Sequence, residues 1–205
     1  RQYWHYRFTP EKMSEAEGIQ TFRMDIPGSA LVAFRGVGVV DAPLWKIATV
    51  FDDITRKLEW VAKIKEARVV RPISETNRVE YNHTSAPWPV SDRDFVFTAK
   101  TVLDREKRTM TIEIESVDDP LMPPASGVVR GELMNSRYVL TALGDGSKTN
   151  VEVEIKADPK GSLPKWVVNL FQKSWPRTTL EGIRRQSAKA DVREHEAVRK
   201  YFSGG

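Results

Sequence analysis

The side chains of this chain that could carry acid–base or nucleophilic chemistry are few and scattered. There is no cysteine, which excludes disulfides, thiolate metal sites and cysteine nucleophiles. Of the three histidines, His5 and His195 fall in the terminal segments, and a lone His83 within a strand is more often structural than catalytic. The acidic pairs 52–53 and 118–119 fall at a helix end and a turn, where carboxylates cap and solvate the backbone. No metalloprotease, phosphate-loop or nucleophile-elbow motif occurs, so the sequence favours binding over catalysis.

The most distinctive segment is a proline-bracketed loop at 86–90, which runs into a strand that begins at Arg93. Pro87 and Pro89 fix their own φ angles and push the preceding residues into extended conformations, so Trp88 must project from a stiff loop. Loops normally run over the protein surface. We therefore interpret the Trp88 ring as a lid over an apolar cavity, with a plug in the open end of a barrel-like sheet as the alternative.

Hydrophobic periodicity predicts the elements that would position these residues. Alternation with period two predicts strands at residues 19–23, 31–40, 64–73, 76–84, 93–104, 108–117, 127–142 and 148–158. Three helices are predicted, beginning at 41–43, covering 55–60, and beginning at Pro164 with a kink at Pro176. Gly36 and Gly38 indicate a bulge or a close backbone approach. Most strands have one apolar and one polar face, which is typical of an antiparallel sheet.

Four segments, in order along the chain, resemble those of START domains, the lipid-transfer modules related to the steroidogenic acute regulatory protein. Residues 87–96 resemble the family signature, and the other three segments are 29–38, 127–132 and 160–169. The resemblance implies an α+β helix-grip fold, in which a strongly curved antiparallel sheet wraps around a long C-terminal helix. It also implies a lipid ligand in a cavity under that helix.

Two positions bear on the polarity of that ligand. Family members that bind sterol or phospholipid carry a carboxylate on the strand before the loop and an arginine six residues after the arginine that opens the next strand. In this chain the first position is Glu80, but the second is Ala99. Phe95, Phe97 and Ala99 share one apolar face, and an unpaired phosphate buried there would cost several kcal/mol. We therefore expect a neutral or weakly polar lipid such as a sterol, hopanoid, isoprenoid or fatty acid.

The sequence leaves two questions about this polar site open. Because Val79 and Tyr81 are apolar, periodicity points Glu80 outward, whereas the family resemblance points it into the cavity, which is the orientation we adopt. Either Arg78 or Arg130 could replace the missing arginine.

The predicted ligand-binding residues combine these positions with the apolar faces of strands and of the last helix: Glu80, Trp88, Phe95, Phe97, Ala99, Ile112, Ile114, Arg130, Val153, Val167, Leu170, Phe171 and Ser174. No catalytic residue, metal ligand or cofactor is predicted. The loop at 87–89 and the last helix are the predicted gate. The main alternative is an aromatase- or cyclase-like enzyme that acts on a polyketide or another hydrophobic molecule, with Glu80, Asn82, Thr84 and Arg130 as its polar groups. A ligand-sensing or protein-interaction module is a third interpretation.

The 205 residues are expected to form an N-terminal arm at 1–17, a START-like domain at 18–186 and a charged helical extension at 187–205. In the arm, Trp4, Tyr6 and Phe8 alternate, which indicates a strand or an extended segment.

The charge and apolar content restrict partners and compartment. The net charge of +4 is too small for a nucleic-acid-binding surface, and the basic residues of the last segment alternate with acidic ones as on a solvated helix face. No apolar run reaches the ~20 residues of a membrane span. We expect a soluble monomer that contacts membranes only transiently. The cytoplasm is the expected compartment, with the periplasm or secretion after signal removal as alternatives.

Overall fold

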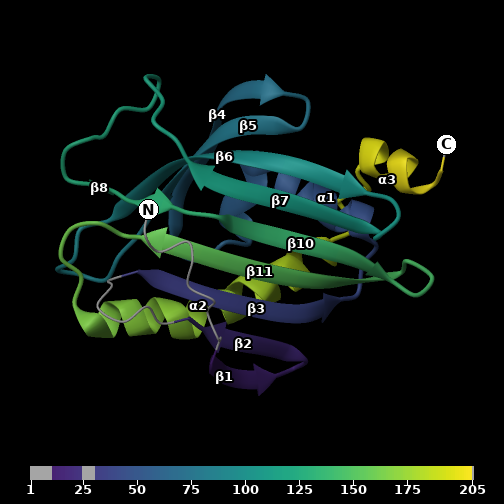
Figure 1. The fold of residues 1–205 in the computed structure, drawn as a ribbon, viewed down its shortest axis with the longest axis horizontal. Helices are drawn as coiled ribbons and strands as arrows, with labels where there is room; N and C mark the ends of the chain where they lie inside the picture. Colours follow the sequence, from purple (N-terminus) through teal and green to yellow (C-terminus); the bar gives the residue numbers. More distant parts are fainter. Residues whose placement is uncertain (1–10, 25–30, 205) are drawn as a thin grey trace.

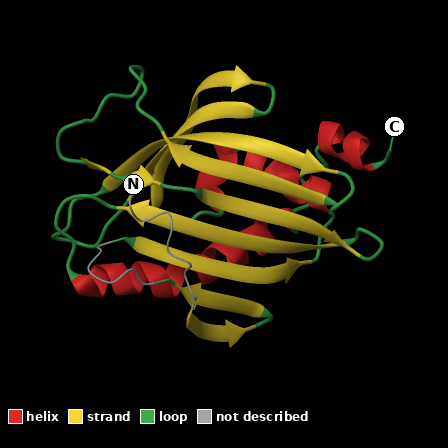
Figure 2. Ribbon diagram, in the orientation of Figure 1, coloured by secondary structure: helices red, strands yellow, loops and turns green. Residues whose placement is uncertain are grey.

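The computed structural model describes residues 11–24 and 31–204 (Figures 1 and 2). The alternation of Trp4, Tyr6 and Phe8 lies outside the described residues. The elements follow in this order: β1 (Glu11–Ala16), β2 (Ile19–Arg23), β3 (Val32–Val40), α1 (Leu44–Asp52), the 3-10 helix η2 (Ile54–Glu59), β4 (Ile64–Ser74), β5 (Asn77–Thr84), β6 (Arg93–Asp104), β7 (Thr109–Ser116), β8 (Val129–Arg130), β9 (Glu132–Leu133), β10 (Ser136–Leu143), β11 (Lys148–Asp158), α2 (Lys165–Ser187) and α3 (Glu196–Phe202).

The strands form one curved sheet in the order β1-β2-β3-β11-β10-β7-β6-β5-β4, and the pairs along this path are antiparallel. The short strands β8 and β9 pair with β6 and β11 respectively. Figure 2 shows α1 and α2 together on one face of this sheet. The predicted α+β architecture, a curved antiparallel sheet around a long C-terminal helix, is confirmed.

Helix α2 packs closely on its neighbours because glycine leaves room at two contacts. A Cβ atom on Gly36 of β3 would lie 3.1 Å from the Cβ of Pro176, so the predicted close approach is confirmed. A Cβ atom on Gly182 would lie 2.1 Å from the carbonyl oxygen of Trp60, which η2 brings against the helix. The helix continues across the buried Pro176 and ends at Ser187, and the segment after it forms the separate helix α3.

The region predicted as a single strand at 127–142 is instead two strands of two residues each, β8 and β9, followed by the eight-residue strand β10. Gly131 lies against the ring of Phe95, where a Cβ atom would come within 2.4 Å of a ring carbon. Asn135 has a φ of 43°, in the left-handed region, which ends β9 before β10 begins. These two local features break the pairing that period-two alternation alone predicts.

Strand β5 is covered on both faces. On its outer face a small apolar cluster is packed under the segment that follows β7, and it comprises Val79, Tyr81 and Val96 with Val70, Val117 and Met122 against them. The main core lies on the inner face of the sheet, between the strands and the helices α1 and α2. Apolar residues at alternate positions of β5 therefore do not identify its inner face.

Candidate ligand-binding cavity

A cavity of about 320 Å³ lies on the inner face of the sheet, at the end of the molecule where α1, η2 and α3 gather. We call this region the cavity end. Strands β6, β7 and β10 provide its floor, and α1, η2 and α3 its walls. The opposite region is built from residues 85–92, the 159–164 turn and the first half of α2, and we call it the loop end.

Strand register places the polar corner of the cavity. In the β5–β6 ladder, Glu80 stands opposite Phe97 and Arg78 stands opposite Ala99. Residues directly opposite in an antiparallel pair point to the same face, so Glu80 and Arg78 face inward with the predicted apolar residues. Glu80 is buried and lines the cavity. The family pattern has its arginine at the position of Ala99. In this chain Arg78, on the neighbouring strand, therefore brings a cation to the cavity instead.

The charges of this corner are paired with one another. Arg78 Nε lies 3.1 Å from Glu80 Oε2, and its Nη1 lies 3.2 Å from Asp52 Oδ1 at the end of α1. Lys57 Nζ lies 3.6 Å from Glu80 Oε1. His195 Nε2, at the start of α3, lies 3.4 Å from Asp52 Oδ2. Two cations thus face two carboxylates at the end of an otherwise largely apolar cavity.

Lys57 is the functional candidate that the sequence did not indicate. Its Nζ donates a hydrogen bond to Asn82 Oδ1 at 3.2 Å and lies 5.5 Å from the centre of the Phe97 ring. Burial lowers the pKa of Lys57 below its ordinary value of 10.5, while the nearby carboxylate of Glu80 opposes this shift. A single lysine in a short helical turn resembles a solvated side chain, and only the packing of η2 against the sheet shows otherwise.

Three further polar groups border the cavity without a full set of partners among the described residues. The indole Nε1 of Trp60 and the amide Oδ1 of Asn77 are buried and have no hydrogen-bond partner. Tyr138 also lines the cavity, and burial together with the charge of Glu80 raises its pKa. Buried groups of this kind normally find partners, so the Trp60 and Asn77 atoms are unsatisfied polar groups just behind the cavity wall.

Two smaller voids continue toward the loop end. One, of about 90 Å³, shares Lys57, Phe97, Ile114 and Tyr138 with the large cavity. The other, of about 40 Å³, is lined by Phe95, Phe171 and residues 84–86 beneath the loop. The internal space is thus widest at the cavity end and narrows toward the proline-bracketed loop.

The predicted site residues divide into three groups in the structure. Five line the large cavity, and they are Glu80, Phe97, Ala99, Ile112 and Ile114. Phe95 and Phe171 line the smaller voids. The remaining six do not line any of these three spaces.

Trp88 and Arg130 point away from the interior. The Trp88 side chain is 90% exposed, because the turn at 87–90 projects it outward, so neither a lid nor a plug describes its position. Arg130 belongs to β8, which pairs with β6 beside Asp94. Its Nε lies 2.7 Å from the buried carboxylate of Asp94, on the outer face that also holds Tyr81. Arg130 is therefore a structural partner of Asp94 rather than the substitute cavity cation.

The other four residues lie on β11 and α2. The prediction extended the cavity lining to more positions of the core and of the inner side of α2 than the structure shows. Val153 and Val167 are fully buried but do not line a cavity. Leu170 is 44% exposed, and the Ser174 hydroxyl donates to the Leu170 carbonyl on the same side of α2. The stripe that faces the sheet passes instead through Phe171 and continues one turn on at Trp175 and Pro176.

The polar groups that an enzyme would need are not gathered at one point. Glu80 lines the large cavity, Asn82 and Thr84 line the neighbouring void, and Arg130 is on the other face of the sheet. Among residues 11–24 and 31–204, no three histidine, cysteine, aspartate or glutamate side chains are placed to hold a metal ion. No helix within these ranges is both long and apolar enough to span a bilayer.

A curved sheet that grips a long helix and encloses an apolar cavity defines a helix-grip ligand-binding protein. The sequence profile of the START domain matches residues 10–189, so the chain belongs to the START domain family. It is 30% identical over 168 residues to the bovine phosphatidylcholine transfer protein, covering 80% of this chain and 77% of that protein. It is 25% identical over 175 residues to an uncharacterised protein of Pseudomonas aeruginosa, covering 85% of each chain.

Solved structures show the same fold. The structure of human STARD10 superposes with a TM-score of 0.78 at 20% identity, covering 88% of this chain and 74% of that chain. A STAR-related lipid transfer protein fragment from Xanthomonas axonopodis superposes with a TM-score of 0.75 at 26% identity, covering 88% of this chain and 99% of that one. Several of the matched proteins are named as phosphatidylcholine or lipid transfer proteins.

Proposed function

We propose that this protein binds and transfers one hydrophobic lipid of neutral or weakly polar character, such as a sterol, hopanoid, isoprenoid or fatty acid. The observation that carries the proposal is the pairing of charges in the cavity corner. Lys57 and Arg78 each face a carboxylate, so a phosphate would have to displace Glu80 or Asp52 to find a counter-ion. Displacement of Glu80 would leave a buried carboxylate without its partners, which is costly. The exposed Asp52 carboxylate would be displaced at a smaller cost.

Cavity size and unpaired polar groups support the same ligand class. A volume of about 320 Å³ is near the lower end of the range of roughly 300–1,000 Å³ for small-molecule pockets. Such a volume suits one compact hydrocarbon body better than two long acyl chains. A small shift of either side chain would let the Trp60 N–H donate to a hydroxyl or carbonyl group on that body, or the Asn77 oxygen accept from a hydroxyl.

Phosphatidylcholine is the ligand to compare with, because the bovine relative is named as a phosphatidylcholine transfer protein. Competition between a fluorescent sterol or fatty acid and a fluorescent phosphatidylcholine tests the proposal directly. The wild-type protein is expected to prefer the sterol or fatty acid by about tenfold. Preference for phosphatidylcholine would defeat the proposal.

A matched pair of substitutions tests the physical reason. Ala99→Arg adds a cation to the inner face of β6 next to Arg78, and we expect it to shift binding toward phosphate-bearing lipids. Thr98→Arg adds the same cation to the outer face of the same strand and should leave the preference unchanged. Equal shifts in both variants would mean that net charge, and not the cavity corner, sets the preference.

Membrane contact is proposed for the loop end. Trp88 is 90% exposed and Trp166, on the first turn of α2, is 54% exposed, with Leu170 and the exposed Lys165 beside Trp166 on the helix. Pro89 and Pro164 border one groove between the loop and the start of α2. Tryptophan and lysine side chains of this kind favour the bilayer interface. Vesicle co-sedimentation should weaken in Trp88→Ala and in Trp166→Ala, and unchanged binding of both variants would remove this surface from the proposal.

The loop at 87–89 and the first half of α2 are proposed as a gate, as the sequence predicts. The void beneath them is lined by Ala86, Phe171 and Trp175, so movement of either element would open it. Hydrogen exchange should show less protection in these two segments than in the second half of α2, because their opening breaks fewer hydrogen bonds. Equal protection along α2 would argue against this gate.

A further inference from the structure

The short helix α3 lies outside the family domain yet forms part of the large cavity. The START domain profile ends at residue 189, and α3 covers Glu196–Phe202. Ala197, Val198 and Tyr201 line the cavity, together with His195 just before the helix. Figure 1 shows α3 at the C-terminal end of the chain, beside α1 and the ends of β6 and β7. One wall of the ligand cavity is therefore supplied by a segment that the family domain does not include.

This wall is attached by a small set of contacts: Val198 and Phe202 pack on the core, the His195 amide donates to the Trp45 carbonyl at 2.8 Å, and His195 Nε2 lies 3.4 Å from Asp52 Oδ2. Val198 is the buried residue of the seven in α3, and a helix of this length is not stable by itself in water. The contacts of α3 with its neighbours must therefore hold it in place. Local stability of this kind allows a segment to open while the rest of the protein stays folded.

The attachments at the far end of α3 come from β6 and the turn after it. Tyr201 OH donates to the carbonyl of Leu103 at 3.2 Å, and Arg105 Nε donates to the carbonyl of Tyr201 at 3.0 Å. The Arg105 guanidinium also lies 4.7 Å from the centre of the Tyr201 ring. Arg105 is exposed and does not line the cavity, so it can be altered without changing the cavity wall.

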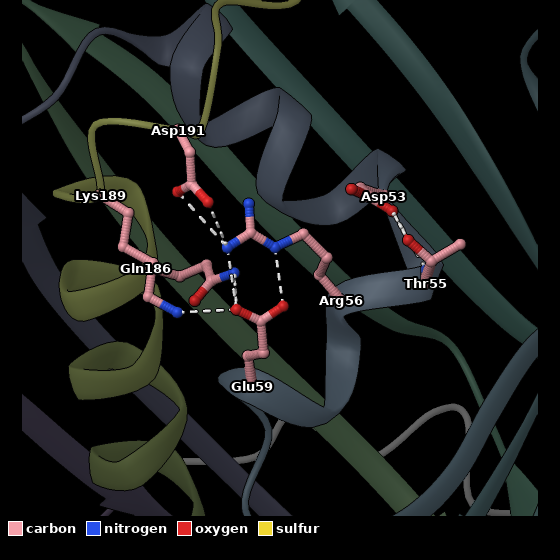
Figure 3. Close-up of polar contacts among 7 residues, drawn as sticks. All are labelled: Asp53, Thr55, Arg56, Glu59, Gln186, Lys189 and Asp191. Carbon is pink, nitrogen blue, oxygen red and sulfur yellow. Dashed lines mark hydrogen bonds and ion pairs between the residues drawn. The ribbon is translucent and has the colours of Figure 1, made fainter.

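The segment that leads into α3 is anchored to η2 by ion pairs. Figure 3 shows Glu59 of η2 accepting from Arg56 at 2.7 Å and from Lys189 at 2.8 Å, while Arg56 Nη2 lies 3.2 Å from Asp191 Oδ2. The buried Val192 follows directly. The exposed residues 193 and 194 lie between this anchor and His195, whose amide donates to the carbonyl of Trp45 at 2.8 Å, so displacement of α3 must break this hydrogen bond.

We propose that α3 is a movable wall of the large cavity, and that its displacement about residues 193–194 opens a second passage for the ligand. The passage of a ligand rests on the proposed function, but the movement of α3 does not. This opening lies at the cavity end, where the space is widest and the rim includes the exposed Glu75 and Thr76. It is distinct from the gate predicted at the loop end.

Cysteine labelling tests the movement without any ligand, because the chain contains no cysteine. Ala99→Cys places a thiol in the large cavity, and Ala157→Cys places a matched thiol in the small void at the loop end. Both alanines are buried on strands. Each variant is labelled with N-ethylmaleimide alone and in combination with Arg105→Gln, Lys107→Gln or Trp88→Ala. Lys107→Gln removes a positive charge from the same turn as Arg105 and serves as the charge control.

Arg105→Gln is expected to speed labelling of Ala99→Cys about twofold to fivefold, as loss of one exposed charged contact allows. Labelling of Ala157→Cys should stay unchanged, and Lys107→Gln should have no effect at either position. Three outcomes would overturn the proposal. The first is no increase in labelling at Ala99→Cys, and the second is an equal increase at both cysteines. The third is an increase at Ala99→Cys that Trp88→Ala causes and Arg105→Gln does not.

Two further measurements keep the outcomes separate. If Ala99→Cys does not fold, as judged by circular dichroism, Thr101→Cys reports on the same cavity wall. Binding of a fluorescent fatty acid and a fluorescent sterol to the wild-type protein is measured in parallel. If the protein shows the expected labelling pattern but binds neither probe, the movement of α3 is supported and the proposed function is refuted.

Discussion

The cavity end and the loop end distribute charged and apolar side chains in opposite ways. At the cavity end, Lys57, Arg78 and Glu80 are held on the inner side of the sheet beside the cavity of about 320 Å³. At the loop end the interior space is small, and the large apolar side chains of Trp88 and Trp166 face outward. The comparison separates two tasks, with ligand recognition at one end and surface contact at the other.

The two ends should also differ in how much stability a substitution removes. Buried charges depend on one another, so removal of one member at the cavity end exposes its partners to an apolar environment. Exposed rings at the loop end keep few contacts within the protein. Substitutions at the two ends should therefore separate an effect on stability from an effect on membrane contact.

The largest effect is expected at Glu80. Glu80→Leu leaves Lys57 and Arg78 without their buried carboxylate, and we expect the free energy of unfolding to fall by about 3–5 kcal/mol. Urea denaturation measures the change. Glu113→Leu, on the exposed side of β7, should cost no more than about 0.5 kcal/mol. Similar costs in both variants would show that the buried charges are not coupled.

A smaller effect is expected from Asp92, the carboxylate that holds the loop end together. Its Oδ2 lies 2.8 Å from Lys65 Nζ and 2.8 Å from His83 Nε2, and its Oδ1 accepts from the Ala86 amide at 3.0 Å. Asp92→Asn should lower the free energy of unfolding by about 1–3 kcal/mol, as loss of hydrogen bonds to a charged group predicts. Asn in place of the exposed Asp118 is the control.

The stabilisation by Asp92 should depend on pH, because the pKa of its carboxyl group is shifted in the folded protein. The hydrogen bond from Lys65, followed by those from the Ala86 amide and His83, lowers the pKa of Asp92 below its usual value. The stabilisation is complete above the ordinary aspartate pKa of about 4 and is lost as the pH falls through the lowered pKa. Asp92→Asn should therefore flatten the acid side of the stability curve, and an unchanged acid slope would contradict the assignment.

Lys57 should give a pH slope of the same sign on the alkaline side. Burial lowers its pKa below 10.5, so between the lowered pKa and 10.5 the unfolded chain binds more protons than the folded one. The free energy of unfolding should rise with pH in this range, by about 1.4 kcal/mol for each unit of pKa difference. Lys57→Met should abolish the rise between about pH 8 and pH 10, below the ordinary tyrosine pKa. A rise that persists in the variant would assign it to another group.

The smallest effect on stability is expected at Trp88. Because its side chain is 90% exposed, Trp88→Ala should change the free energy of unfolding by less than about 0.5 kcal/mol. A buried tryptophan would cost about 3–5 kcal/mol. The denaturation midpoint is the measurement, made on the sample used for vesicle binding. A midpoint that collapses would show that the loop end is packed in solution and would erase the contrast between the two ends.

Local patterns in the sequence predicted most of the strands and the helix-grip architecture. Period-two alternation in β6 predicted the shared face of Phe97 and Ala99, because successive side chains of a strand must point to opposite faces. It failed at β5, where the outer face is also covered. Val79 and Tyr81 are buried there under the segment after β7, so apolar character no longer identifies the inner side.

The sequence by itself determined the fold class and the absence of an arginine at position 99, since both depend on residue types at fixed spacing. Only the tertiary structure decided which cations reach the cavity. Lys57 reaches the cavity because η2 packs against the sheet, and Arg78 because the register of β5 with β6 turns it inward. Arg130 forms an ion pair with Asp94 on the outer face. Contacts between residues far apart in the chain fix these positions, and no local pattern encodes them. The same reason explains why α3, which reads as a charged tail in the sequence, forms a wall of the cavity.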